Sequence, residues 1–589
     1  MKSINKIFAA GAIALVMGVG ATSCMDDLNV IPEYPTAKTW EDVMNDPDQY
    51  LPQAFSKCYS CLAVSGQSGE GSTDLSGVDA GKSNYLRALF QLNEKTTDEC
   101  AWIWTEAGIE NLVRGTWDSG NTYIYGAYSR FYVNIAICNE FLRQLEQTGV
   151  DMQAQKTAYN CAEQYKLEVR AIRAMLYWNV LDNFGNGGWI DETVEYGTPA
   201  EPILRADLYE KVVAELKDII AKWPAENANH VAYGRVGLDG VKMLLAKVYL
   251  NAEVYTGGAK TAYNECAELC KEIIANHQGG GFQGSGLANH YLALFAGNND
   301  RYAPGGSATA ENEILWNVPF DEVYVQSFGG SRYLMAAAFQ NSDFTIDEET
   351  GKKTGFYMNA ADYGLNDVWA CMHARQQFSE KFDNSGNDVR DDFWSKEAEG
   401  FTKENTDYST FNNGYAPIKF TNLNTNDDGT FPLIDPAKGT VISNISEAAL
   451  PHPANALETH PNTDTPIFRL SDTYLMAAEC LLRGATNVTA ADALQYVNYV
   501  RERANADAWP QSMLTLPNLL DERARELYWE LHRRSDLIRY GKFVSGYNWA
   551  WKGYVLEGTD LNSNFTVFPI PANNIAAQPD LAAVQNPGY

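Results

Sequence analysis

Flat aromatic side chains beside planar polar ones form the pattern in this sequence that points most directly to chemistry. Trp102 and Trp104 lie two residues apart just after Asp98-Glu99, and Trp117 follows. The chain has 14 Trp and 33 Tyr, more than its core needs. A partly exposed ring can stack on the C–H face of a neutral sugar, while planar polar groups hold its hydroxyls. Residues i and i+2 of a strand point to one side, so this pair offers two stacking rings, or one stacking ring and one core ring.

Two glycine- and asparagine-rich motifs have a binding interpretation, but a structural one is preferred for both. Residues 279–284 fit G-x-G-x-x-G, yet they follow a predicted helix instead of a strand, which indicates a loop. A second series falls near EF-hand spacing but starts with Asn and ends with Asp instead of a bidentate Glu, which favours a turn. Its members are Asn424, Asn426, Asp428, Gly429 and Asp435. A structural calcium stays open there, and we predict no other cofactor or metal.

The acidic residues along 521–536 raise the question of a catalytic carboxylate pair. They alternate with Arg at helical spacing, so a salt-bridge network on a helix explains them better. The sequence contains neither H-E-x-x-H nor G-x-S-x-G. We therefore predict no catalytic site.

The N-terminus has the features of a bacterial lipoprotein signal. Lys2 and Lys6 precede a short apolar run over residues 7–19, and Ala21-Thr22-Ser23 leads into Cys24. The run is too short for a permanent membrane span, so residues 1–23 are predicted to be cleaved and Cys24 to carry the lipid. An ordinary secretory signal with an incidental cysteine is the alternative. We find no other stretch of about 18 uninterrupted apolar residues.

Length, charge and cysteine content limit the classes of function. The chain has 589 residues, more than one ordinary core, and 45% of them are hydrophobic, as in a folded protein. Its net charge of -30 repels phosphate backbones, which makes nucleic acid an unsuitable ligand. Cys58 and Cys61 have C-x-x-C spacing without a second pair, and Cys266 and Cys270 lie one helical turn apart. We interpret the latter pair as small buried hydrophobes, and no disulfide framework follows.

Helical periodicity recurs along the chain. From Leu167, small and apolar residues recur at steps of three and four until Phe184-Gly185. Asp207 and Glu210 have capping-box spacing, which predicts a helix that starts there and ends before Pro224. Further helices are expected over residues 241–252, 262–274, 474–482 and 491–503. Such helices, joined by short turns, resemble tetratricopeptide hairpins, with generic helical hairpins as the alternative.

The amino-acid composition changes between about residues 278 and 460. Gly, Asn, Asp and Thr dominate, a strand-like run over 314–318 is isolated, and 346–352 has the composition of a hairpin tip. We expect an irregular, loop-rich region with short strands, laid over a helical scaffold, where binding sites usually lie.

Motifs in five places resemble the SusD/RagB family. Residues 521–530 and 532–542 are similar to a hallmark helix of that family, and Phe568-Pro569-Ile570-Pro571 and residues 585–589 resemble its closing signatures. Residues 168–185 match an early helix, and residues 89–99 resemble the segment that leads into its ligand loop. Together with the lipoprotein start, these motifs span essentially the whole mature chain in the expected order.

The resemblance implies a mainly α fold of about four tetratricopeptide-like pairs with a large loop-rich ligand face. It implies an N-terminal helical region over residues 24–277, a ligand-facing region over 278–460, and a C-terminal helical region over 461–589. It also implies a non-catalytic lipoprotein at the cell surface, anchored in the outer membrane, that binds glycans for a SusC-like TonB-dependent transporter.

The same resemblance implies roles for individual residues. Trp102 and Trp104 would supply stacking rings from the ligand loop, and Trp369 an opposing ring. Asp79 and Arg87 would hold sugar hydroxyls, with a turn aspartate and a structural ion pair as the alternative. Two looser matches complete the expected cleft, and Phe328 lacks the hydroxyl that a tyrosine would offer there. These matches are Phe328, Arg332 and Tyr333, followed by Trp369.

The sequence thus leads to one main prediction of function with two alternatives. We expect a glycan-binding lipoprotein that works with a transporter and is not an enzyme. A secreted glycoside hydrolase of helical fold and a helical-repeat scaffold that binds only protein are the alternatives. The identity and linkage of the glycan do not follow from the sequence.

Overall fold

A computed structural model describes residues 39–195, 197–228, 232–300, 313–391, 394–407, 409–424 and 459–589. Of residues 361–362, 394–395, 434–435 and 440–441, only the backbone is described. The predicted signal segment 1–23 and Cys24 lie outside the described residues, as do Asn426, Asp428 and Gly429 of the candidate calcium loop.

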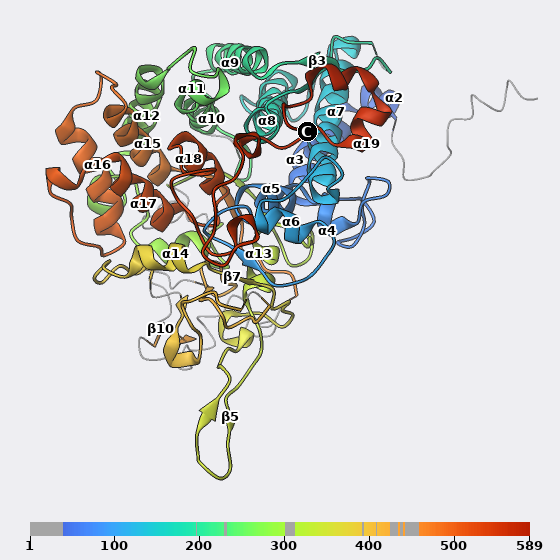
Figure 1. The fold of residues 1–589 in the computed structure, drawn as a ribbon. Helices are drawn as coiled ribbons and strands as arrows, with labels where there is room; N and C mark the ends of the chain where they lie inside the picture. The colour runs from blue at the N-terminus through green and yellow to red at the C-terminus, as the bar shows by residue number, and fades with distance from the viewer. Residues whose placement is uncertain are drawn as a thin grey trace, which may run out of the picture.

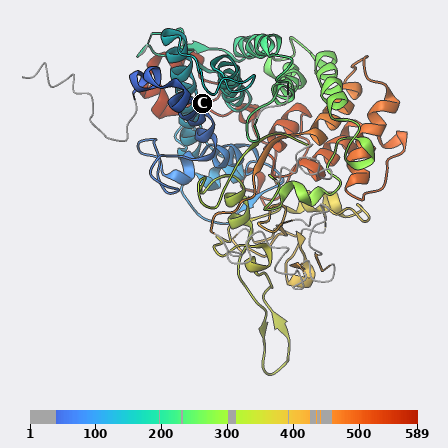
Figure 2. The ribbon, with the colours of Figure 1, turned by 180° about the vertical axis from the view of Figure 1, so that it is seen from behind.

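In the described parts of the chain, eight helices each pack against the next one in sequence (Figures 1 and 2). In order they are α3 (Pro47–Ala63), α7 (Thr122–Thr148), α8 (Ala162–Asn183), α9 (Arg205–Lys222), α10 (Leu238–Leu250), α12 (Tyr263–His277), α15 (Leu470–Leu482) and α16 (Ala490–Arg503). Each helix buries an apolar face that its neighbour covers, which is the packing expected of repeated helical pairs. The prediction of a mainly α fold with about four helical pairs is confirmed.

The ends of two helices show where the sequence pattern was right and where it was wrong. α8 ends at Phe184 and Gly185 adopts a φ of 69°, the left-handed conformation expected after a helix. α9 begins at Arg205, earlier than the predicted start, so Asp207 already lies in its first turn. The start is stabilised instead by Asn186, whose Oδ1 accepts a hydrogen bond of 2.8 Å from the Arg205 N–H. The N-terminus of α9 is therefore capped by a residue outside the helix and not by the predicted Asp207–Glu210 pair.

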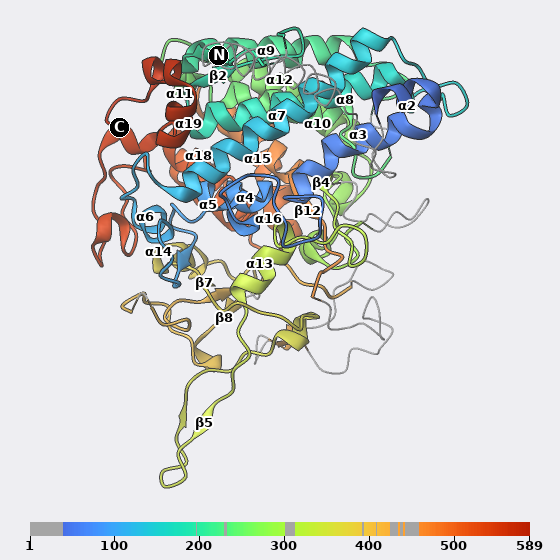
Figure 3. The same ribbon diagram turned by 90° about the vertical axis from the view of Figure 1, so that its right-hand side faces the viewer.

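Short strands occur between the helices, several of them in the loop-rich region, as expected. β4 (Ile314–Val318) coincides with the predicted strand and pairs antiparallel with β12 (Thr465–Arg469), which leads directly into α15. β5 (Thr345–Ile346) and β6 (Lys353–Thr354) pair around the predicted hairpin tip. Figures 1 to 3 show this hairpin as an arm that projects away from the helices.

The predicted hallmark helix over 521–536 is two helices, which corrects the sequence interpretation. α17 (Leu516–Leu527) ends at Tyr528, and α18 (Arg533–Arg539) begins after a turn in which Trp529 and Leu531 adopt φ values of 62° and 71°. The turn is fastened to a distant segment, because Trp529 donates its backbone N–H to Glu99 Oε2 at 3.1 Å. Periodicity alone did not show this break.

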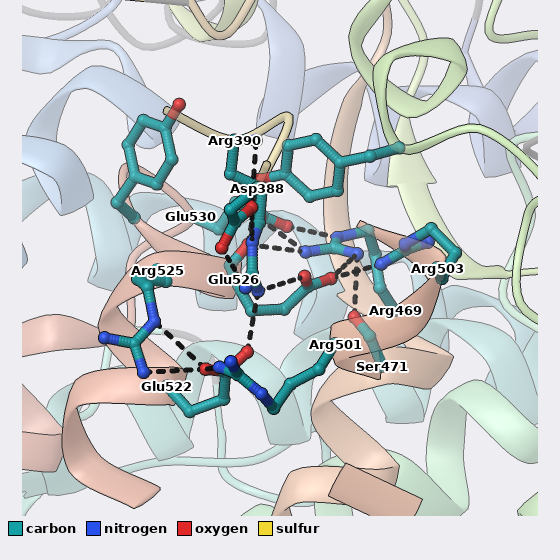
Figure 4. A network of polar contacts seen from close by, with 12 residues as sticks. Asp388, Arg390, Arg469, Ser471, Arg501, Arg503, Glu522, Arg525, Glu526 and Glu530 are labelled. Atoms are coloured by element: carbon teal, nitrogen blue, oxygen red, sulfur yellow. Dashed lines mark hydrogen bonds and ion pairs between the residues drawn. The ribbon is translucent and has the colours of Figure 1, made fainter. Parts of the chain in front are cut away.

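The predicted salt-bridge network is present on the inner face of α17 (Figure 4). Glu526 meets Arg503 at 2.6 Å, Arg469 at 3.0 Å and Arg390 at 3.1 Å. All four side chains are fully buried, so each charge depends on its partners for compensation. We call this set, together with Asp388, Glu313, Arg501, Glu522, Arg525 and Glu530, the ionic network.

The cysteines of the described residues are free thiols, and Cys266 and Cys270 are buried in α12 as expected of small hydrophobes. Among the described helices, none combines the length and the apolar character that a membrane crossing requires.

Candidate functional site

The predicted site residues come from four segments that hydrogen bonds join into one unit. β1 (Ala101–Trp102) pairs with β7 (Met372–His373), and Ile103 donates its N–H to Cys371 O at 2.9 Å. The stretch before β7 is fixed to the end of α13 (Gly330–Ala338), because Trp369 donates to Ala336 O at 2.7 Å. Figure 3 shows α13 beside β7 on the side of the molecule from which the hairpin projects. This arrangement brings Trp104, Tyr333 and Trp369 to one place.

Six aromatic side chains form a continuous run of ring contacts across this unit, which we call the aromatic series. Trp104 contacts Trp102 edge-on at 5.7 Å between ring centroids, and Trp102 stacks on Tyr333 at 5.9 Å and 27°. The run continues from Tyr333 to Trp369 at 6.1 Å. It then passes through Phe328 at 6.0 Å and ends at His460, 5.6 Å further. Every predicted ring of the site belongs to this series.

Two cationic side chains from one stretch of chain pack on the faces of these rings. The Arg87 guanidinium lies 4.6 Å from the Tyr333 centroid and 5.3 Å from that of Trp369. Lys95 Nζ lies 3.1 Å from the centroid of Trp102. Such contacts are attractive because the ring face is negative. Both cations come from the same stretch of chain, since α5 (Tyr85–Asn93) carries Arg87 and ends just before Lys95.

Burial divides the predicted rings into two groups. Trp104, Trp369 and Phe328 are half-buried, whereas Trp102 and Tyr333 are each only 1% exposed. Trp104, Tyr333 and Lys95 pack against Trp102, and Tyr333 lies in α13, all of whose residues are buried. In this conformation Trp102 and Tyr333 support the half-buried rings, and a direct contact of either with ligand stays a prediction.

Arg332 also has a supporting position instead of an open one. Its side chain is fully buried, its guanidinium is ion-paired with Asp367, and it donates to Asp367 O at 2.8 Å. The guanidinium also lies 5.2 Å from the Trp369 centroid. Arg332 therefore fixes the segment that carries Trp369, and its contact with ligand stays a prediction.

Asp79 and Arg87 lie on two short neighbouring helices at the edge of the aromatic series. Asp79 caps α4 (Ala80–Ser83), with Oδ1 accepting from Lys82 N at 3.0 Å, and its side chain remains 62% exposed. The Arg87 guanidinium packs against Gly81, where a β-carbon would come within 2.9 Å of it. Asp79 thus has the structural role of a turn residue that caps a helix, and its carboxylate is also exposed to solvent.

Several buried polar atoms in this unit have no hydrogen-bond partner. They include Arg87 Nε, Lys95 Nζ, Trp102 Nε1, Arg332 Nε, Tyr333 OH and His460 Nδ1. Burial lowers the pKa of Lys95 well below its usual value and raises that of Tyr333. Each such group destabilises the folded protein by about 1–3 kcal/mol.

Sequence reasoning missed Lys95, Asp367 and His460. Lys95 directly precedes the Thr96-Thr97-Asp98-Glu99 segment that was singled out, but a lysine is the residue type least expected inside a protein. Asp367 lies two residues before Trp369 and so was within reach of the same motif. Nothing in the sequence beside His460 indicates an aromatic contact.

In the described residues, no group of three or more His, Cys, Asp or Glu side chains could hold a metal ion. Two carboxyl groups do lie together, since Glu94 and Glu99 interact with each other, and burial raises the pKa of both above the usual range of a carboxyl group. Both side chains are at most 1% exposed, so neither can reach a substrate.

Comparison with known proteins identifies the relatives of this chain. The sequence model of the SusD family matches residues 312–589. The starch-binding protein SusD of Bacteroides thetaiotaomicron is 30% identical, and the alignment covers 100% of this chain and 99% of SusD. The SusD-like protein P25 of Formosa agariphila is 24% identical over 72% of each chain.

Solved structures share the fold at lower identity. Surface glycan-binding protein A from Bacteroides thetaiotaomicron, in complex with laminarihexaose, is 20% identical with a TM-score of 0.60, covering 92% of this chain and 99% of that one. A SusD superfamily protein from Bacteroides vulgatus is 18% identical with a TM-score of 0.60, covering 94% and 100%. By its full-length identity to SusD, this chain belongs to the SusD family.

Proposed function

We propose that this protein binds a neutral oligo- or polysaccharide across the half-buried rings of the aromatic series and does not cleave it. The observation that carries the proposal is that Trp104 and Trp369 keep part of each ring open, while the Arg87 guanidinium packs on Trp369 and against Gly81, two residues from the exposed carboxylate of Asp79. Two relatives add support, since one is named for starch binding and another was solved with laminarihexaose.

The division between buried and half-buried rings suits this role. A stacking platform must hold its orientation before the sugar arrives, because ordering a loose ring during binding costs free energy. Trp102 and Tyr333 lie between the two open rings and contact both of them, so they fix the spacing of the platform. Arg87 lies on Tyr333 and Trp369, which leaves the edge of its planar guanidinium to donate to sugar hydroxyls.

A neutral glycan fits the charges around the site. Arg332 is compensated by Asp367, and Lys82 by Asp79 at 3.7 Å. The whole chain carries a net charge of -30, which repels a polyanion. An uncharged glycan is not repelled by this net charge.

The same arrangement argues for binding without catalysis. A glycosidase needs two carboxyl groups on either side of the scissile bond. Glu94 and Glu99 are buried, and Glu522, Glu526 and Glu530 are ion-paired inside the ionic network. The open Asp79 is a helix cap without a second carboxylate in contact with it.

The site is tested by retention in gels that contain starch, laminarin, xylan, pectin or mannan. We expect at least one gel to retain the wild type without release of reducing ends. Trp104→Ala and Trp369→Ala should lose this retention. Trp189→Ala is the matched control, because Trp189 is also half-buried but stacks on Tyr177 among the helices. New reducing ends would indicate a glycoside hydrolase, and absence of retention by every gel would favour a protein-binding scaffold.

We further propose that Cys24 carries a lipid that anchors the protein at the outer surface of the outer membrane, where it passes glycan to a SusC-like TonB-dependent transporter. The proposal rests on the small residues that lead into Cys24 and on family membership. Cys24→Ala should move the protein from the membrane to the soluble fraction in cells that lack the transporter. Purification of the wild type should recover the transporter, and its absence from the purified material would contradict the partnership.

A further inference from the structure

A tight turn close to the aromatic series presents an aromatic ring to solvent. Tyr324 is 88% exposed, the highest value among the large hydrophobic side chains of the described residues, and Val323 beside it is 60% exposed. Transfer of such a ring from water is favourable, so a sequence that presents it outward forgoes that stabilisation.

The turn that carries Tyr324 is held firmly. Asp321 Oδ1 accepts hydrogen bonds from Val323 N at 2.8 Å and from Tyr324 N at 2.7 Å, and Asp321 forms an antiparallel bridge with Val325. These bonds fix the backbone that carries the ring. An exposed ring on a fixed base can bind with a small loss of conformational entropy.

A single segment connects this turn to the end of the aromatic series. Asn462 holds the turn, because its Oδ1 accepts from Glu322 N at 3.1 Å and its Nδ2 donates to Glu322 Oε2 at 3.0 Å. Two residues earlier, His460 contacts Phe328. Tyr324 stands four residues before Phe328, so their Cα atoms are at most about 14 Å apart. The exposed ring therefore lies on a turn that is close to Phe328, the last half-buried ring of the series.

We propose that Tyr324 is an additional stacking position for a further sugar unit, so that the preferred ligand is an extended glycan chain and not a mono- or disaccharide. This inference rests on the proposed glycan-binding function. The chain would pass along Trp104, Trp369 and Phe328 and reach Tyr324 at the rim. Affinity should then rise with chain length until the ligand spans from Trp369 to Tyr324.

The test measures binding by calorimetry with size-fractionated oligosaccharides, from the disaccharide to the heptasaccharide, prepared from whichever of the five polysaccharides retains the wild type. Tyr324→Ala should weaken binding of the longest oligosaccharides about tenfold and leave the shortest unchanged. Tyr324→Phe should bind as wild type, because the ring and not the hydroxyl is required. Tyr159→Ala is the control, since Tyr159 is also exposed but lies between α7 and α8.

The possible outcomes separate this inference from the function on which it rests. If the longest oligosaccharides bind Tyr324→Ala as tightly as wild type, the additional stacking position is wrong while glycan binding stands. If short and long oligosaccharides lose affinity equally, Tyr324 shapes the central site and the inference is again wrong. If no polysaccharide retains the wild type, both proposals are overturned.

Discussion

The aromatic series and the ionic network both hold cations against partner side chains, but the kind of partner differs. In the ionic network each guanidinium meets carboxylates, as Arg469 meets Glu526 and Glu530 (Figure 4) and also Glu313. On the aromatic series Arg87 and Lys95 meet ring faces, and Arg87 Nε and Lys95 Nζ have no hydrogen-bond partner among the described residues. Carboxylates compensate the cations of the ionic network, whereas ring faces cover these two cations beside half-buried rings.

The difference separates stability from binding. Removing one member of a compensated cluster leaves its partners buried and uncompensated, which is costly to the folded state. Removing a half-buried ring at the edge of a cluster leaves most of the core intact. Its main effect is therefore a loss of ligand affinity. The two regions therefore predict opposite results for mutations of similar size.

The largest effect is expected in the ionic network. Glu526→Gln removes the carboxylate that Arg390, Arg469 and Arg503 share, so the free energy of unfolding should fall by about 3–5 kcal/mol. Chemical denaturation measures the change. Glu268→Gln, which breaks an exposed pair with Lys271, is the control and should cost well under about 1 kcal/mol. Equal midpoints for Glu526→Gln and wild type would show that the network does not stabilise the fold.

Trp102→Ala should come next, because it belongs to the aromatic series yet is buried. The loss of a fully buried indole predicts a fall of about 3 kcal/mol or more in the free energy of unfolding. Glycan binding should weaken too, since Trp104 loses the ring that supports it. Thermal melting with calorimetric binding on the same sample measures both. An unchanged melting temperature would mean that the indole is not part of the core.

Acid should weaken the ionic parts of the molecule before it affects the aromatic series. Arg469 and Lys419 hold the pKa of Glu530 at about 2, and Arg533 holds that of Asp98 at about 2, although burial alone would raise both. Depressed values mean that the stabilisation is present above the unfolded pKa values, near 4.5 and 3.8, and is lost as pH falls toward 2. Each group contributes about 2–3 kcal/mol. Denaturation midpoints between pH 5 and pH 2 should therefore fall steeply, and a flat profile would contradict the assignment.

Asp79→Asn should give the smallest effect. Asparagine caps a helix as well as aspartate does, so the melting temperature should not change. Loss of the charged acceptor should weaken binding of a glycan by roughly 1 kcal/mol, about fivefold. Calorimetry at low and high salt is the measurement. Unaltered affinity would place the edge of the site elsewhere.

Local patterns predicted the helices well, because an amphipathic period and a following glycine are written in neighbouring residues. The strand over 314–318 and the membership of Trp369 and Phe328 in one site followed from composition and from family motifs. The strand and the two aromatic positions could be predicted because each is encoded by a few neighbouring residues.

The remaining features depend on contacts between distant segments, which one sequence does not reveal. The start of α9 is set by Asn186, and the break between α17 and α18 by Glu99, far along the chain in the second case. Likewise, Trp102 and Trp104 have the same residue type and lie two residues apart, but only Trp102 stacks on Tyr333 of a distant segment and is fully buried. The choice between the two rings required the structure.

The central claim is that the open rings serve the ligand and not the fold, and Trp369→Ala tests it most directly. Thermal melting and calorimetric binding of one sample, against an oligosaccharide that binds the wild type, should show affinity reduced by about 2 kcal/mol or roughly 30-fold. The melting temperature should change far less than in Trp102→Ala. If Trp369→Ala binds as wild type, or loses affinity only in proportion to a fall in melting temperature, the aromatic series is core packing and the glycan site lies elsewhere.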